Sequence, residues 1–316
     1  MASDESLRAL YTQMCHGRAD WESLAWDEAP LATCPQLLPS ALTAAAFPRT
    51  WPALDPDQRT CLTRLQLACE TEVFIYLEHA IVAAAQGVLA ALPPDAAAAP
   101  ALAKLVEEEY NHIQQFQRYL RTRLPELYPP AGFTYRFKPH ARVRAFTALV
   151  ARVARRAPSA GLLWGEYFEL LTIQLHAVLR ELAHDTDPLL GRLHQLHARE
   201  EARHVALDRI VIADDYDRRG LPGRVARSWG SLGIFAVIND IERAGFAALI
   251  ARFVRDDPAR ERHRATLLED VRLTERTALF ERTAARFAPE FRKLEPLVGR
   301  ALFERVMLRG SMPGAA

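Results

Sequence analysis

Apolar residues recur along most of the chain at spacings of three and four, which place them on one face of an α-helix. No run of alternating β-branched residues lies between two hairpin turns, so strand signals are scarce. A short extended piece is expected only at FTYRF, residues 133–137. The pattern therefore predicts an all-α protein. Its expected helices span residues 57–91, 101–123, 141–156, 159–184, 188–218, 223–255, 258–286 and 288–308.

Prolines and loop segments divide this helical pattern into one expected domain, residues 1–316. Five prolines interrupt residues 1–55, which are expected to form an irregular N-terminal wrap. The four longest helices within residues 57–218 are expected to form a four-helix bundle core, because short loops place successive helices side by side. Residues 223–308 are expected to add helices that pack around this core.

Composition narrows the classes of function without naming one. Half of the residues are apolar, which is enough for a sizeable core. The net charge is only +1, from 40 basic and 39 acidic residues, which argues against a nucleic-acid partner. The N-terminus has no signal-peptide apolar run, and no uninterrupted apolar stretch is long enough to span a membrane. No membrane contact is therefore expected. The four cysteines form no CxxC pair, which fits a reducing cytoplasm, and this is the expected location.

The segment LHAREEARH carries the first chemical signal. His197, Glu201 and His204 lie at offsets of four and seven, which are roughly 40° and 20° apart around a helix. They therefore share one stripe, and Leu193 and Leu207 lie close to it. A buried row of imidazoles and a carboxylate without a partner would be costly. A metal ion would satisfy it, because both groups are ligands for iron, manganese or zinc.

The other long helices offer matching donors. The second helix carries EEEYNH, in which Glu109 and His112 form an ExxH pair on one face. The first helix offers Glu78 within FIYLEHAIV, and the third offers either Glu166 or Glu169 within WGEYFELL. The four helices thus carry, in chain order, a lone Glu, an ExxH pair, a lone Glu and a second ExxH pair. A dinuclear metal site in a helical bundle requires this arrangement.

A third ExxH pair shows that ExxH spacing alone does not identify a metal-ligand pair. Glu181 and His184 lie at the end of their helix, beside Asp185 and Pro188, and are interpreted as a solvated helix end. Incidental histidines and glutamates, in an all-helical interaction module without a metal, remain the alternative to a metal site.

Three segments resemble a known family: YLEHAIV, WGEYFE and LHAREEARH are similar to the ligand helices of the p-aminobenzoate N-oxygenases. These are ferritin-like non-haem di-iron enzymes. The resemblance covers roughly residues 60–215, favours Glu78 over Glu70 and Glu72, and favours Glu169 over Glu166. It implies a ferritin-like bundle with additional N- and C-terminal helices. It also implies seven metal ligands: Glu78, Glu109, His112, Glu169, His197, Glu201 and His204.

The resemblance also implies an activity. A member of this family holds two iron ions per chain and uses O2 as co-substrate and an external electron donor. It oxygenates a small amine through hydroxylamine and nitroso stages toward a nitro group, often in bacterial natural-product biosynthesis. A homodimer is expected on the same ground. The residues leave open C–H hydroxylation, oxidative C–C cleavage, or a non-catalytic ferritin-like iron-binding role, since the same ligands serve all of them.

Four further residues are candidates for supporting roles. Asp208 follows His204 by one turn and is expected to accept a hydrogen bond from a ligand imidazole, unless it is a surface residue. Phe74, Trp164 and Phe168 are expected to line a substrate pocket beside the metals, or to be ordinary core residues.

Overall fold

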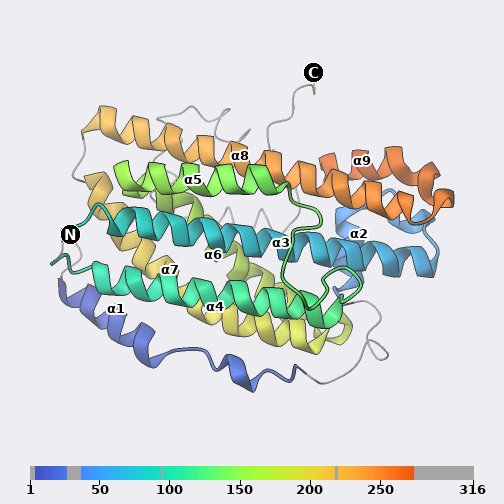
Figure 1. Cartoon of the computed structure of the whole chain (residues 1–316), viewed down its shortest axis with the longest axis horizontal. Coiled ribbons are helices and arrows are strands. Elements are labelled where there is room, and N and C mark those ends of the chain that lie inside the picture. The colour runs from blue at the N-terminus through green and yellow to red at the C-terminus, as the bar shows by residue number, and fades with distance from the viewer. Residues whose placement is uncertain (1–3, 27–36, 94, 218–219, 274–316) are drawn as a thin grey trace.

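The computed structural model describes residues 4–26, 37–93, 95–217 and 220–273. Every regular element within these ranges is a helix, which confirms the all-α prediction. The helices run roughly along the long axis of the molecule, as Figure 1 shows.

Four long helices form the centre of the fold. They are the four predicted core helices, with bounds that differ by a few residues: α3 (Pro56–Leu89), α4 (Ala99–Arg123), α6 (Pro158–Glu181) and α7 (Pro188–Asp217). Helix α3 packs against α4, and α6 against α7, while α3 also contacts α6 and α4 contacts α7. In Figure 1, α3 and α4 cross the front and α6 and α7 lie behind them. This closed arrangement is consistent with the expected ferritin-like bundle.

Helix α3 is set in place by its first turn and by its burial. The Asp55 side chain accepts a hydrogen bond from the Gln58 backbone N–H (2.8 Å), and Oε1 of Gln58 accepts one from the Asp55 backbone N–H (3.3 Å). This capping box satisfies two free backbone donors. The helix is long and apolar enough to span a membrane by composition, yet 72% of its most apolar window is buried inside the bundle. Its apolar composition is therefore explained by contact with neighbours on every side.

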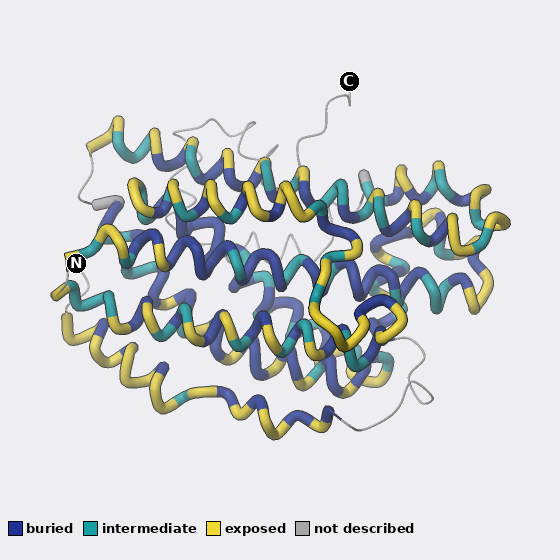
Figure 2. Tube along the Cα trace, viewed as in Figure 1, coloured by how far each residue is buried: buried dark blue, intermediate teal, exposed yellow. Residues whose placement is uncertain are grey.

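Two outer helices cover the bundle on the side of α3 and α6. Helix α5 (His140–Arg156) packs on α3 and α6, and α8 (Leu221–Arg255) packs on α3, α5 and α6. The buried residues of α5 are spaced by three and four, as an amphipathic surface helix requires. Figure 2 shows the result, with buried positions gathered at the centre and exposed ones along the outer faces of α1 and α5.

The N-terminal region is more regular than its prolines predict. Two helices form there, α1 (Asp4–His16) and α2 (Ser40–Ala46), together with the 3-10 turns Trp21–Ser23 and Trp51–Ala53. In α1, Leu7, Leu10 and Met14 are buried, a spacing of three and four that faces α4 and α7. The prediction of an irregular segment was wrong for α1, because only this narrow stripe is apolar and it needs the bundle to pack against.

The predicted extended piece at 133–137 is not a strand. The backbone N–H groups of Arg136, Phe137 and Lys138 donate to the buried carboxylate of Glu72 instead of to a neighbouring strand. Glu72 also accepts from the Tyr128 hydroxyl (2.7 Å), so this one side chain fixes the connection between α4 and α5.

The C-terminal helices differ from prediction where they can be compared. The helix expected at 258–286 begins as a 3-10 segment, Pro258–His263, and continues as α9 (Arg264–Leu273). The Asp257 side chain accepts from the Ala259 N–H (2.9 Å), which favours the tighter first turns. The remainder of that helix and the one expected at 288–308 lie outside the described residues.

Candidate metal centre

The structure brings all seven sequence-predicted ligands together inside the bundle. Each is at most 3% exposed. They come from all four core helices: Glu78 from α3, Glu109 and His112 from α4, Glu169 from α6, and His197, Glu201 and His204 from α7.

The seven side chains form two groups that share one residue. In each group, one donor atom of every residue lies within 4.8 Å of the others. The first group consists of Glu78, His112, His197 and Glu201; the second consists of Glu109, Glu169, Glu201 and His204. Two four-membered groups of imidazole nitrogens and carboxylate oxygens, joined at one carboxylate, fit a site for two metal ions.

Two glutamates face both groups. Oε1 of Glu201 lies 2.7 Å from Nε2 of His197 and 3.2 Å from Nδ1 of His112, while its Oε2 lies 3.3 Å from Nδ1 of His204. Glu109 is placed in the same way, with Oε2 3.2 Å from His112 Nδ1 and Oε1 2.9 Å from His204 Nδ1. Each of these carboxylates can therefore bridge two ions, and Glu78 and Glu169 remain as one-sided carboxylates.

The charges of the site point to bound cations. Burial and the nearby carboxylates Asp208 and Glu201 raise the pKa of Glu169 well above its usual range. Both Glu169 oxygens are buried and accept no hydrogen bond from the described residues. Although burial opposes the charged form, Glu201 and Glu108 raise the pKa of His204 to about 10, so protons compensate the carboxylates without metal. Two metal ions would replace those protons and satisfy the free oxygens.

A second layer of carboxylates holds two of the three imidazoles. Nε2 of His112 lies 2.9 Å from Oε2 of Glu200, and Nε2 of His204 lies 2.9 Å from Oε2 of Glu108. Each contact crosses between helices, because Glu108 precedes Glu109 on α4 and Glu200 precedes Glu201 on α7. The outer glutamate of each helix thus orients the histidine of the other and leaves its Nδ1 free for a metal.

Basic and aromatic groups close this side of the site. Nη2 of Arg203 lies 3.3 Å from Oε1 of Glu108 and 3.8 Å from Oε1 of Glu200. The Ala19 N–H donates to Glu200 (2.7 Å), and the Trp21 ring meets the His112 ring edge-on at 5.7 Å. Although burial opposes ionisation, His112 and the Ala19 N–H lower the pKa of Glu200 to about 2. The segment after α1 therefore helps to keep this outer carboxylate charged.

The third imidazole has a different environment. Nδ1 of His197 is buried and has no hydrogen-bond partner among the described residues. Its ring lies edge-on to Phe116 at 5.0 Å and to Phe74 at 6.0 Å, and 6.2 Å from the ring of His194. Burial lowers the pKa of His194 well below its usual range, and repulsion from His197 and His176 adds to this. His194 is therefore a neutral imidazole at pH 7.

Comparison with known proteins agrees with this geometry. A family model described as P-aminobenzoate N-oxygenase AurF matches residues 18–294. The chain belongs to the AurF family. The matched range includes all seven ligands, both outer glutamates and Ala19, and begins after α1. No curated protein matches the chain.

A small cavity adjoins the ligand groups of this AurF-family chain. Its volume is about 30 Å³, room for one or two water molecules, and it lies between α3 and α6. Three of its lining residues are carboxylates of the site, Glu78, Glu169 and Glu201. The other lining residues are Val73, Phe74, Leu77, Ile81, Phe168, Leu171 and Thr172. Phe74 and Phe168 therefore line this cavity, and that substrate binds in it stays a prediction.

Two of the supporting roles inferred for this AurF-family chain differ from the observed placement. Trp164 is fully buried and does not line the cavity; it packs behind Phe168 (ring centroids 6.2 Å apart) and against Phe146. Asp208 is buried, but neither of its oxygens accepts a hydrogen bond from the described residues. Both nitrogens of His204 face other carboxylates, so Asp208 is not the partner of that ring.

Three residues close to the ligands, Glu108, Glu200 and Thr172, were not predicted, although the sequence carries a signal for each. Both ExxH pairs of this AurF-family chain are in fact EExxH, with Glu108 and Glu200 in the first position. The repeated doubling marks the outer glutamates. Thr172 follows Glu169 by three residues and thus shares its face of α6, which is the signal for its place in the cavity.

Proposed function

We propose that this chain is a di-iron oxygenase that uses O2 to oxygenate the nitrogen of a small amine. The observation that carries the proposal is the pair of buried donor groups joined at Glu201, in a chain of the AurF family. Two bound iron ions would supply the coordination sites and the redox chemistry that O2 activation requires. Iron is taken from the family, because these ligands also suit manganese.

The ligands would divide between the ions according to the two groups. Glu78, His112 and His197 would hold one ion, and Glu169 and His204 the other, with Glu109 and Glu201 shared. The outer glutamates fix the tautomer of two imidazoles. The three histidines add nitrogen donors without adding negative charge, which limits the charge that must be buried.

The cavity sets the requirements for the substrate. Its walls are mostly apolar and include the rings of Phe74 and Phe168, which favour a flat apolar molecule, and these rings must move to admit one because the cavity holds only one or two water molecules. A closed apolar wall would also keep water away from the reacting nitrogen. The first oxygenation balances as amine, O2, two electrons and two protons giving hydroxylamine and water, and we propose that an external electron donor supplies the electrons. A cytoplasmic homodimer remains part of the proposal, and size-exclusion chromatography tests the dimer.

The test is to load the purified protein with Fe2+ and expose it to isotopically labelled O2, a reductant and a panel of aryl and alkyl amines. We expect label in the nitrogen-bound oxygen of at least one product, and none from Glu201→Ala. Label found only on carbon would replace N-oxygenation with C–H hydroxylation. Oxygen consumption that no amine accelerates would favour the non-catalytic iron-binding role.

A further inference from the structure

A buried histidine outside the ligand set has no evident structural role. His194 is 3% exposed, and its Nδ1 has no hydrogen-bond partner among the described residues. Buried polar atoms are nearly always paired, so an unpaired one calls for an explanation. The Phe74 and Phe116 rings pack on it at 5.1 and 5.5 Å, which holds the imidazole in an apolar wall beside His197.

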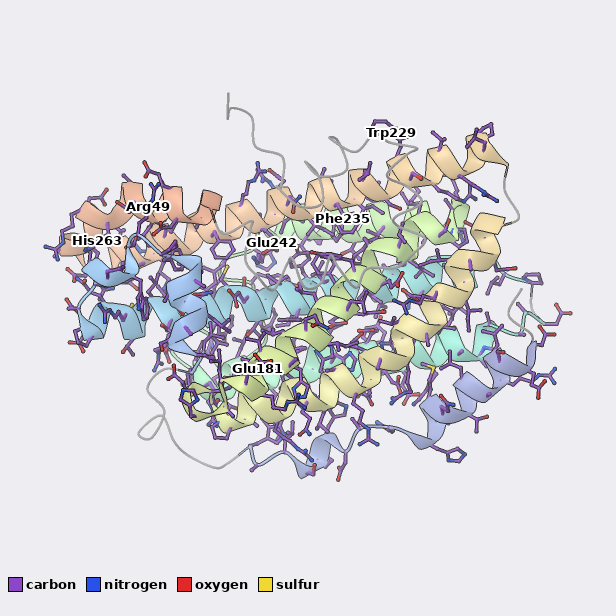
Figure 3. The ribbon with its side chains drawn as sticks, turned by 180° about the vertical axis from the view of Figure 1, so that it is seen from behind. Arg49, Glu181, Trp229, Phe235, Glu242 and His263 are labelled. Carbon is purple, nitrogen blue, oxygen red and sulfur yellow. The ribbon has the colours of Figure 1, made fainter. Side chains whose placement is uncertain are left out.

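A second unassigned histidine lies opposite the first. Helices α6 and α7 are antiparallel, joined by the short turn Ala183–Asp185, and they lie side by side in Figure 3, where Glu181 marks the end of α6. Glu169 on α6 and Glu201 on α7 meet in one ligand group. Seven residues toward the turn from each lie His176 and His194, so the two histidines share the register of the two glutamates. Seven residues are about two turns, or roughly 10 Å along the axis.

His176 completes a line from the surface to the metal site. It is half-buried, and its own Nδ1 is also buried without a partner among the described residues. His194 is next along the seam between α6 and α7, and His197 is the ligand that follows it, with the rings of His194 and His197 6.2 Å apart. Neither His176 nor His194 belongs to the two donor groups.

We propose that His176 and His194 form an uptake route along which metal ions reach the dinuclear site. The site itself is closed, since every ligand is at most 3% exposed. A divalent ion that enters the bundle must exchange its hydration shell for protein donors, because an uncompensated charge in an apolar interior is costly. Neutral imidazoles are suitable donors for ferrous iron. His176 takes the ion at the surface, His194 holds it transiently, and His197 receives it as a final ligand. This inference rests on the proposed dinuclear iron site.

The experiment measures the rate at which metal-free protein takes up Fe2+ under anaerobic conditions, with free ion trapped by a coloured chelator at successive times. We expect His176→Gln and His194→Gln each to slow uptake about tenfold, which corresponds to about 1.4 kcal/mol in the barrier, while the final content stays at two ions. His79→Gln is the matched control, because His79 is another half-buried histidine on a core helix.

His176→Gln keeps the test decisive if the buried His194 variant folds poorly, because its position is only half-buried. An uptake rate of His176→Gln within twofold of the unmodified protein would overturn the route. Equal slowing by His79→Gln would overturn it as well. If the unmodified protein binds two ions and both variants take them up at its rate, the proposed enzyme stands and only this inference is removed. Protein that binds no metal at equilibrium contradicts both.

Discussion

The crossed contacts between the outer glutamates and the ligand histidines predict a selective loss of metal affinity. Replacing Glu200 with Gln keeps the size of the side chain and an acceptor oxygen but removes its charge. Oε2 of Glu200 lies 2.9 Å from Nε2 of His112, on the far side of the ring from the first metal group. The change should therefore weaken the ion held by His112 and leave the ion held by His204 largely unaffected.

The size of the effect follows from the loss of a charged partner. Although burial opposes ionisation, His112 and the Ala19 N–H lower the pKa of Glu200 to about 2, so its carboxylate is charged at neutral pH. The glutamine retains a hydrogen bond to the ring, so only the charge is lost. Removing such a partner of a metal-bound histidine typically weakens metal binding by about 10–100-fold. We expect a loss in that range for one of the two ions.

The assay is a titration of metal-free protein with Co2+ in competition with a chelator of known affinity, which resolves the two binding steps. Glu108→Gln should weaken the other step, because Glu108 contacts His204. Glu107→Gln is the matched control, since Glu107 adjoins these residues but its side chain is 52% exposed. Equal weakening of both steps by Glu200→Gln, or a loss as large in Glu107→Gln, would refute the assignment of one outer glutamate to each metal.

Three further predictions follow from the site. In metal-free protein the pKa of His204 is about 10 against 6.5 when unfolded, so its contribution to stability is complete below pH 6.5 and is lost as the pH rises through 10. Metal must displace that proton, so the increase in Tm on adding Co2+ should become larger between pH 6.5 and 9. An increase in Tm that becomes smaller over this pH range would contradict the prediction. Phe168→Ala should enlarge the cavity and raise kcat/KM for bulkier amines relative to small ones, and an unchanged ratio would remove Phe168 from the substrate path. Trp21→Ala should lower the free energy of unfolding by about 3 kcal/mol and weaken metal binding, because Trp21 packs on His112; normal metal affinity would show that the segment after α1 only adds stability.

The ligand set could be anticipated because helical geometry restricts it so strongly. The spacing of His197, Glu201 and His204 fixes their common direction, and the nearby Leu193 and Leu207 indicate that this direction is inward. The third helix was harder, because Glu166 and Glu169 are both buried. Helical spacing leaves both open and the family resemblance favours Glu169. The fold separates them: Glu169 joins the second donor group, whereas Glu166 accepts a hydrogen bond from Arg209 (2.7 Å).

Features that depend on contacts between helices could not be predicted in the same way. Spacing within α7 suggests that Asp208 lies near His204, but which carboxylate meets that ring is decided by how α4 docks, and Glu108 takes the position. Trp164 shares a face with Phe168, yet the packing of α5 places Phe146 against it and closes it off. Helix α1 escaped prediction because its stripe of three apolar residues is stable only on the surface of the bundle.

The central claim is that the bundle holds two metal ions that share Glu201, and metal analysis of the purified protein tests it most directly. Elemental mass spectrometry after loading with Fe2+ and removal of loosely bound metal should find about two iron ions per chain, matching the two donor groups. Glu201→Ala should lower that content sharply. Correctly folded protein that retains no metal, or an iron content that Glu201→Ala leaves unchanged, would contradict the account.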